Sequence, residues 1–172
     1  MLLDDTELYD IVWNKVYAQL HFKPNIYPRK HDFNKNIPFE IEDEFSVYGI
    51  EKMNDAQIDM MDDIVRNIFI DITAEDECIY ALDWQHSAFL YNPRNIEEQK
   101  SIWIKNEQLF GGGYSAYFPS FFPDGDYHFF IDENFRFGYL GHPWRQEVWI
   151  FGRILINKFE QIYQELGWIK LK

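Results

Sequence analysis

The sequence has one cysteine, no long apolar run and few basic residues. Cys78 alone excludes an internal disulfide and a cysteine-rich zinc site. Its neighbours in residues 78–82 predict a buried strand, in which cysteine acts as a small apolar side chain. No segment approaches the roughly 20 apolar residues that span a bilayer, and the N-terminus lacks the pattern of a signal peptide. We therefore predict a soluble cytoplasmic protein that does not enter membranes.

The shortage of positive charge is uneven along the chain. The net charge is −13, and residues 1–78 hold 18 acidic but only 7 basic residues. An acidic surface repels phosphate backbones, so nucleic-acid binding is disfavoured, whereas a basic protein would be attracted. The alternative is that these carboxylates form a solvated surface that aids solubility.

The residues that are abundant are apolar and aromatic. The chain of 172 residues is 47% hydrophobic and 19% aromatic. This length and composition predict one globular domain over residues 1–172, with a core dominated by aromatic side chains.

Three segments have helical periodicity. The first predicted helix has one apolar face, formed by Leu8, Ile11, Val12, Val16, Tyr17 and Leu20. It ends before Pro24, and residues 25–36 are typical of a loop. The last helix begins near Gly152 and ends at Gly167, a good residue for a helix C-terminus.

The second predicted helix begins at Asn54, with Gln57 at capping-box spacing. Its apolar stripe consists of Ile58, Met61, Val65, Ile68 and Ile72. Its opposite side carries Asp55, Asp59, Asp62 and Asp63. Like charges at this spacing repel one another, and either a basic partner or solvent would offset that cost. We predict these four carboxylates as a partner-binding face.

The remaining segments predict strands. One lies within residues 37–50, and the others cover residues 78–82, 87–91, 101–104, 127–131, 135–140 and 147–151. Gly111–Gly113 forms a flexible break. Helices at both ends of a run of strands indicate an α+β fold with a mainly antiparallel β-sheet and helices packed on one face.

Two polar motifs interrupt the strand region. Pro123-Asp124-Gly125-Asp126 is either a β-turn or a pair of carboxylates presented at a strand end as metal ligands or a general base. In Asp83-Trp84-Gln85-His86, an extended backbone would place Asp83 and Gln85 on one face and Trp84 and His86 on the other. His86 is a ligand, a proton shuttle or a structural histidine.

A third motif is Gly141-His142-Pro143-Trp144. Pro143 favours an extended backbone at His142, so that the imidazole and indole would project from a stiff corner. Such a corner suits either ligand recognition or plain packing. Trp84, Gln85, Tyr127 and Trp144 are the candidate ligand-binding residues.

The candidate catalytic residues are Asp83, His86, Asp124, Asp126 and His142. Two histidines with carboxylates can bind a transition metal, but no pair has the short helical spacing of a specific metal motif. We therefore assign neither a metal nor a cofactor. The sequence also contains no Walker loop, nucleophile elbow or dinucleotide fingerprint.

These motifs together resemble a bacterial family, domain of unknown function 2716. The resemblance rests on residues 81–86, 123–127, 141–144 and 151–152, and covers roughly residues 13–156. It implies no particular activity, substrate or cofactor. Some members occur among small genes near polymorphic toxins, which implies an immunity-like role with a toxin-like partner.

Three functions remain open at this stage. We favour an interaction module, immunity-like, that binds a basic protein through its acidic surface. The first alternative is a small hydrolase or metal-dependent enzyme built on the five candidate catalytic residues. The second is a small-ligand binder with an aromatic-lined pocket.

Overall fold

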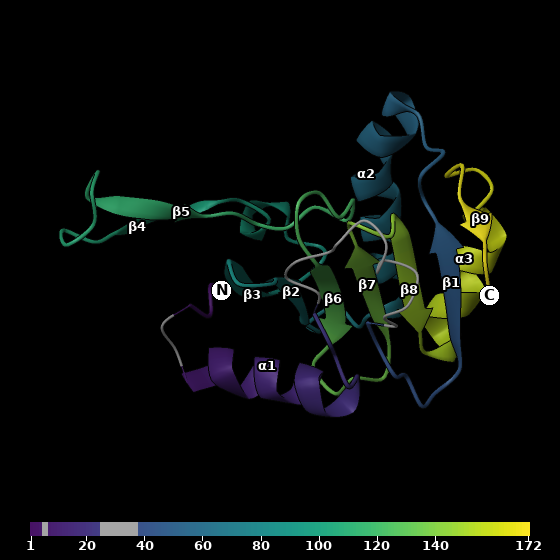
Figure 1. The fold of residues 1–172 in the computed structure, drawn as a ribbon, viewed down its shortest axis with the longest axis horizontal. Helices are drawn as coiled ribbons and strands as arrows, with labels where there is room; N and C mark the ends of the chain where they lie inside the picture. The colour runs from purple at the N-terminus through teal and green to yellow at the C-terminus, as the bar shows by residue number, and fades with distance from the viewer. Residues whose placement is uncertain (5–6, 25–37) are drawn as a thin grey trace.

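The computed structural model describes residues 1–4, 7–24 and 38–172 (Figure 1). The elements in chain order are α1 (Glu7–Gln19), β1 (Phe45–Gly49), α2 (Asp55–Ile72), β2 (Ile79–Asp83), β3 (Ser87–Tyr91), a 3₁₀ helix (Ile96–Glu98), β4 (Ile102–Lys105), β5 (Gly113–Ala116), β6 (His128–Asp132), β7 (Gly138–His142), β8 (Glu147–Phe151), α3 (Arg153–Ile162) and β9 (Ile169–Lys170). None of the described helices is both long and apolar enough to cross a membrane.

Seven strands form one antiparallel sheet in the order β3-β2-β6-β7-β8-β1-β9. β4 and β5 form a separate two-stranded ribbon. The α+β class with a mainly antiparallel sheet is therefore confirmed. The sheet order also places β2 beside β6, which are distant in sequence, and this pairing builds the site described below.

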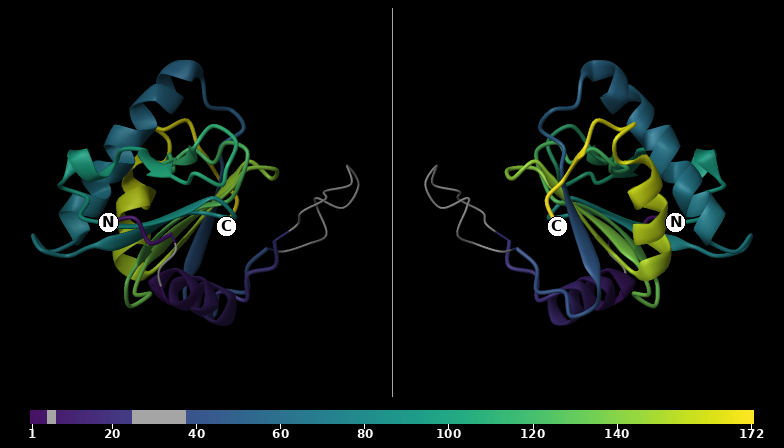
Figure 2. Two further views of the ribbon diagram at one scale, coloured as in Figure 1. Left: turned by 90° about the vertical axis from the view of Figure 1, so that its left-hand side faces the viewer. Right: turned by 90° about the vertical axis from the view of Figure 1, so that its right-hand side faces the viewer.

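Both faces of the main sheet are buried. Successive residues of a strand point to opposite faces, and on β6 Phe130 packs into one core while Phe129 and Ile131 pack into the other. The first core lies under α2 and α3, and the second lies against α1 (Figure 2). Burial on both sides explains why β6 and β8 are continuous apolar runs rather than alternating ones.

The sequence predicted helices packed on one face of the sheet, but the three helices divide between its two faces. α2 and α3 do share a face, but α1 covers the opposite one (Figures 1 and 2). The buried stripe of α1 also differs from the predicted one, because Trp13 is buried whereas Leu8 and Ile11 are exposed. The indole of Trp13 packs on Phe129 of the sheet, and this large contact sets the rotation of the helix.

The local signals around α2 are confirmed. The Asn54 side chain accepts from the Gln57 backbone, and the Gln57 side chain accepts from the Asn54 backbone. Met61, Val65 and Ile68 of its predicted stripe are buried. This reciprocal capping fixes where the helix begins.

Other predictions were less accurate. The strand expected within residues 37–50 is β1 alone, and the loop expected at residues 25–36 lies outside the described residues. β5 and β9 were not predicted. The break at Gly111–Gly113 is confirmed as the tip of the β4–β5 ribbon, where all three glycines have positive φ. This conformation suits glycine because it lacks a Cβ atom.

Candidate functional site

Asp83 is the last residue of β2, and the chain turns sharply after it. The His86 amide donates to the Asp83 carbonyl at 3.0 Å, and Gln85 has a φ of 67°. The segment is therefore a hairpin turn between β2 and β3, so the face assignment that an extended backbone would give does not apply. Because the turn folds back, His86 lies on the same side as Asp83 rather than opposite to it.

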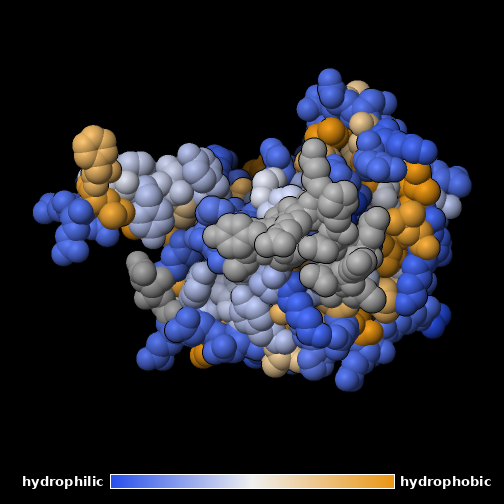
Figure 3. Space-filling view, in the orientation of Figure 1, coloured by the Kyte–Doolittle hydropathy of each residue, from blue (hydrophilic) through white to orange (hydrophobic). Residues whose placement is uncertain are grey.

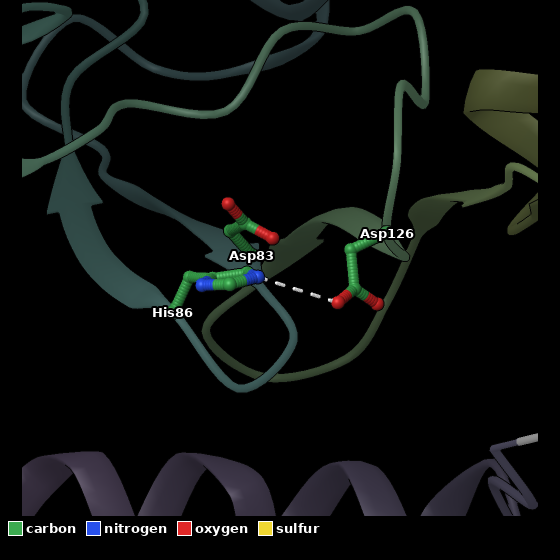
Figure 4. Close-up of side chains that lie close together, drawn as sticks. All are labelled: Asp83, His86 and Asp126. Atoms are coloured by element: carbon green, nitrogen blue, oxygen red, sulfur yellow. Dashed lines mark ion pairs between the residues drawn. The ribbon is translucent and has the colours of Figure 1, made fainter. Parts of the chain in front are cut away.

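Asp126 reaches the same place from the segment before β6. One of its carboxylate oxygens accepts from the Tyr127 amide at 2.7 Å, and the other lies 3.5 Å from Nε2 of His86. Donor atoms of Asp83, His86 and Asp126 all lie within 4.8 Å of one another (Figure 4). The two polar motifs therefore meet in space.

The turn that carries Asp126 docks against Gly141. A Cβ atom at Gly141 would lie 2.8 Å from Cβ of Pro123 and 3.2 Å from the carbonyl oxygen of His128. Only a residue without a side chain allows this approach. Gly141 thus connects the third motif to the site through close packing rather than through a functional group.

His128 lies beside this cluster, next to Asp83, and sequence reasoning missed it. It lies directly opposite Asp83 in the β2–β6 register, and its Nε2 is 3.7 Å from Oδ1 of Asp83. The sequence did contain a signal. His128 stands two residues after Asp126, so an extended chain would place both on the same face.

The hydrogen bonding of His128 defines its tautomer. Its Nδ1 lies 2.9 Å from the carbonyl oxygen of Ser120, which can only accept, so Nδ1 carries a proton. In the neutral ring, Nε2 is then an acceptor, and it lies 3.7 Å from Oδ1 of Asp83. That oxygen is buried and has no hydrogen-bond partner among the described residues. Two acceptors therefore face each other, and a positive charge between them would stabilise the arrangement.

Burial also disfavours the charged forms of the carboxylates. Burial raises the pKa of Asp83 above its usual value, nearby His128 and His86 oppose that rise, and Asp126 adds to it. Burial likewise raises the pKa of Asp126, although the Tyr127 amide and His86 act in the opposite direction. Perturbed pairs of this kind are common at functional sites.

An open pocket of about 610 Å³ adjoins the cluster. One side is the β2–β3 turn with Asp83 and His86, and the other is the segment from Tyr114 to Tyr117 at the base of the β4–β5 ribbon. The His86 side chain is 63% exposed, so the cluster is accessible from solvent. This arrangement combines a polar cluster with space for a small ligand.

The other two candidate catalytic residues do not join this cluster. Asp124 is exposed in its turn. His142 is buried, because alternation along β7 places it with Leu140 on the α1 face of the sheet, opposite to His128. Its ring packs on Tyr127 at 4.7 Å. Burial, with a contribution from the positive Arg145, lowers the pKa of His142 to about 3.

The aromatic residues predicted to bind a ligand pack in or against the second core. Trp84 and Tyr127 are buried and pack edge-to-face at 5.7 Å. Trp144 packs edge-to-face on Tyr127 at 5.1 Å. Of the four candidate ligand-binding residues, only Gln85 lines the pocket. The rings of Trp84 and Tyr127 are buried and cannot stack on a ligand, whereas Trp144 is partly buried beside them.

The acidic residues of α2 lie on its exposed side. Asp55, Asp59, Asp62 and Asp63 are all exposed. Two of them have protein partners, since Asp63 pairs with Arg66 at 2.8 Å and Asp62 accepts from the Phe121 amide at 2.8 Å. Asp62 therefore holds the segment that leads to Ser120 and the site, whereas Asp55 and Asp59 project into solvent.

Comparison with known proteins places the chain in a family. The family described as "Protein of unknown function (DUF2716)" matches residues 2–156, and the chain belongs to it. The chain is also similar to "Uncharacterized protein YxiI" of Bacillus subtilis (strain 168), with 25% identity over 154 residues that cover 88% of this chain and 86% of the relative. No solved structure matches significantly.

Proposed function

We propose that this member of the DUF2716 family binds a divalent transition-metal ion through Asp83, His86 and Asp126, with His128 as a further donor. The observation that carries the proposal is Oδ1 of Asp83, which has no hydrogen-bond partner in the described part of the chain and lies 3.7 Å from Nε2 of His128. A cation between these two acceptors would satisfy both. The Nδ1–carbonyl bond of His128 is also the usual way in which a ligating histidine is oriented.

The donor set indicates which ions fit. Two imidazole nitrogens with two carboxylates suit Zn²⁺, Mn²⁺ or Fe²⁺ better than Mg²⁺ or Ca²⁺, which prefer oxygen ligands. Ligand atoms lie about 2.0–2.2 Å from zinc. Donor atoms of Asp83, His86 and Asp126 already lie within 4.8 Å of one another, and Nε2 of His128 lies 3.7 Å from Asp83, so small side-chain movements would bring the first three to such an ion.

The pocket beside the cluster supports a catalytic role over a purely structural one. A metal ion that keeps an open coordination position can activate water for hydrolysis. The described lining residues include no Lys or Arg, so the pocket offers little to an anionic phosphate. Its Gln, Ser and Tyr side chains suit a small uncharged ligand with hydrogen-bonding groups. We therefore infer hydrolysis of such a substrate.

Calorimetric titration of the chelator-treated protein with Zn²⁺ and Mn²⁺ tests the metal site. We expect one ion per chain, and at least a tenfold weaker affinity in Asp126→Asn and His86→Asn. The matched control is Asp124→Asn, which removes an exposed carboxylate from the same turn and should not change the affinity. The proposal would be contradicted if Asp124→Asn and Asp126→Asn lost metal affinity equally, or if the wild type bound no metal.

A second candidate function is binding of a basic protein through the acidic side of α2. The observation in its favour is that Asp55 and Asp59 are exposed, beside the exposed Met60. Charge complementarity at such a surface would accelerate association and make it sensitive to salt. An immunity-like role with a toxin-like partner would use this surface and does not require the metal site.

The test compares Asp59→Lys with Glu165→Lys, because both reverse one exposed carboxylate. Each tagged variant is used to isolate bound proteins, which are quantified by mass spectrometry. We expect a basic protein to be recovered with the wild type and Glu165→Lys but not with Asp59→Lys. Equal recovery with both variants would count against the acidic surface as the binding site.

A further inference from the structure

The β4–β5 ribbon extends away from the body of the protein (Figure 1). We call residues 102–116 the arm. Among the described residues, its two strands pair only with each other. Isolated two-stranded ribbons are marginally stable in water, because one face and both edges have nothing to pack against. In this arm Ile104, Tyr114 and Ala116 pack against the first core, so it is the outer part of the ribbon that lacks such support.

The arm exposes large apolar side chains, and they gather at its tip (Figure 3). Phe110 is fully exposed, Leu109 is 44% exposed, and Trp103 on β4 is 55% exposed. At the base of the arm, Ile96 is 56% exposed. Contiguous exposed apolar surface of this kind typically marks a protein-interaction site. One chain thus presents apolar groups at both ends of the same arm.

The charge of the arm distinguishes between classes of partner. The arm carries only Lys105 and Glu107, and residues 108–123 contain no charged side chain, although the whole chain has a net charge of −13. A basic partner would find no excess of acidic groups here. A second copy, however, could approach through the arm without the repulsion that its acidic surface would otherwise cause.

One edge of the arm is more accessible than the other. The β5 side faces the β2–β3 turn across the pocket, and Ser87 donates to the Tyr117 carbonyl at 2.5 Å. The β4 edge lies on the far side of the ribbon, and no described strand pairs with it. An unpaired edge offers N–H and C=O groups to another strand.

We propose that two copies of this chain associate through the outer edges of β4, antiparallel and related by a two-fold axis, to form a four-stranded ribbon. In this symmetry, the tip of each arm necessarily lies beside the base of the other. A register centred on Ile104 pairs Ile104 with its own copy and Ile102 with the partner's Asn106. It also places Lys105 opposite the partner's Trp103, where a cation–π contact can form.

Sedimentation velocity tests this association in the full chain. We expect a species of twice the 20.9 kDa chain mass, populated as the concentration rises toward about 100 µM, a range that covers weak interfaces. Trp103→Asp and Phe110→Asp should each weaken dimerisation at least tenfold. Both side chains are exposed, so the circular dichroism spectrum and the thermal midpoint should stay unchanged.

The matched control is Ile154→Asp on α3, which changes an equally exposed apolar side chain away from the arm. It should dimerise like the wild type. A wild type that stays monomeric over the whole range would overturn the proposal. So would a dimer that neither arm variant weakens, or one that the Ile154 variant disrupts.

Discussion

His128 lies opposite Asp83 across β2 and β6, and its Nε2 faces Oδ1 of Asp83 at 3.7 Å. Because Nδ1 of the same ring donates to the Ser120 carbonyl, the contact joins two acceptors unless a positive charge lies between them. That charge is either a proton shared by the two groups or a metal ion. The first prediction separates these two states.

Replacement of Asp83 by Asn should stabilise the metal-free protein at pH 7 by about 0.5–2 kcal/mol. Burial raises the pKa of Asp83, so the fold favours the protonated form, and stability falls as the carboxylate ionises above its ordinary pKa. The neutral amide removes that cost. Urea denaturation with a chelator present measures the difference.

The same variant should lose stabilisation by Zn²⁺, because a ligand that binds only the native state stabilises it. Denaturation repeated with Zn²⁺ provides this comparison. If Asp83→Asn is instead less stable than the wild type with the chelator present, Asp83 and His128 share a proton in the metal-free protein. The pair would then be a hydrogen-bonded structural pair rather than part of a metal site.

His142 should make the protein sensitive to acid. Burial lowers its pKa to about 3, whereas in the unfolded chain it titrates near 6.5. The unfolded state therefore binds more protons between these values, and stability falls as pH decreases below 6.5. At pH 4.5 the contribution of this residue is about 2–3 kcal/mol.

Urea denaturation of the wild type and His142→Gln at pH 7 and pH 4.5 measures this effect. The variant should lose about 2–3 kcal/mol less than the wild type between the two pH values. Comparing each protein with itself cancels any loss that the substitution causes at both pH values. Equal acid sensitivity would show that His142 is not the group responsible.

Gly141→Ala should destabilise the protein by about 1–3 kcal/mol, because the new Cβ atom would be 2.8 Å from Pro123. Since this turn also carries Asp126, metal affinity should fall as well. Gly49→Ala is the control, because its Cβ atom would meet Leu171 at an ordinary 3.6 Å. Thermal denaturation and metal titration of both variants test whether packing at Gly141 positions Asp126. If Gly141→Ala binds metal like the wild type, it does not.

Asp62 and Asp59 should behave differently although both belong to the predicted acidic face. Asp62→Ala removes the acceptor for the Phe121 amide and should cost about 1 kcal/mol. Asp59→Ala should change stability by less than about 0.5 kcal/mol, as for most surface substitutions. Urea denaturation of the two variants side by side provides the measurement. Equal effects would mean that the bond to Phe121 contributes little.

Local signals allowed much of the fold to be predicted. The capping box at Asn54 and the strand at residues 147–151 depend on side chains close in sequence, and both are confirmed. The tight hairpin after Asp83 was not predicted, because Trp84, Gln85 and His86 include none of the usual turn residues. The rotation of α1 was also missed, since it depends on the contact between Trp13 and Phe129 on a distant strand.

For the candidate site, the sequence alone determined which side chains are polar and which strand ends they occupy. It could not determine which of them meet, because strand order and register result from packing across the whole sheet. Only the tertiary structure placed β2 beside β6, so that Asp83 faces His128 and lies near His86 and Asp126. The alternation of side chains along β7 directed His142 to the opposite face. The alternation of side chains is set within each strand, whereas the distance between side chains on different strands depends on how the whole chain folds.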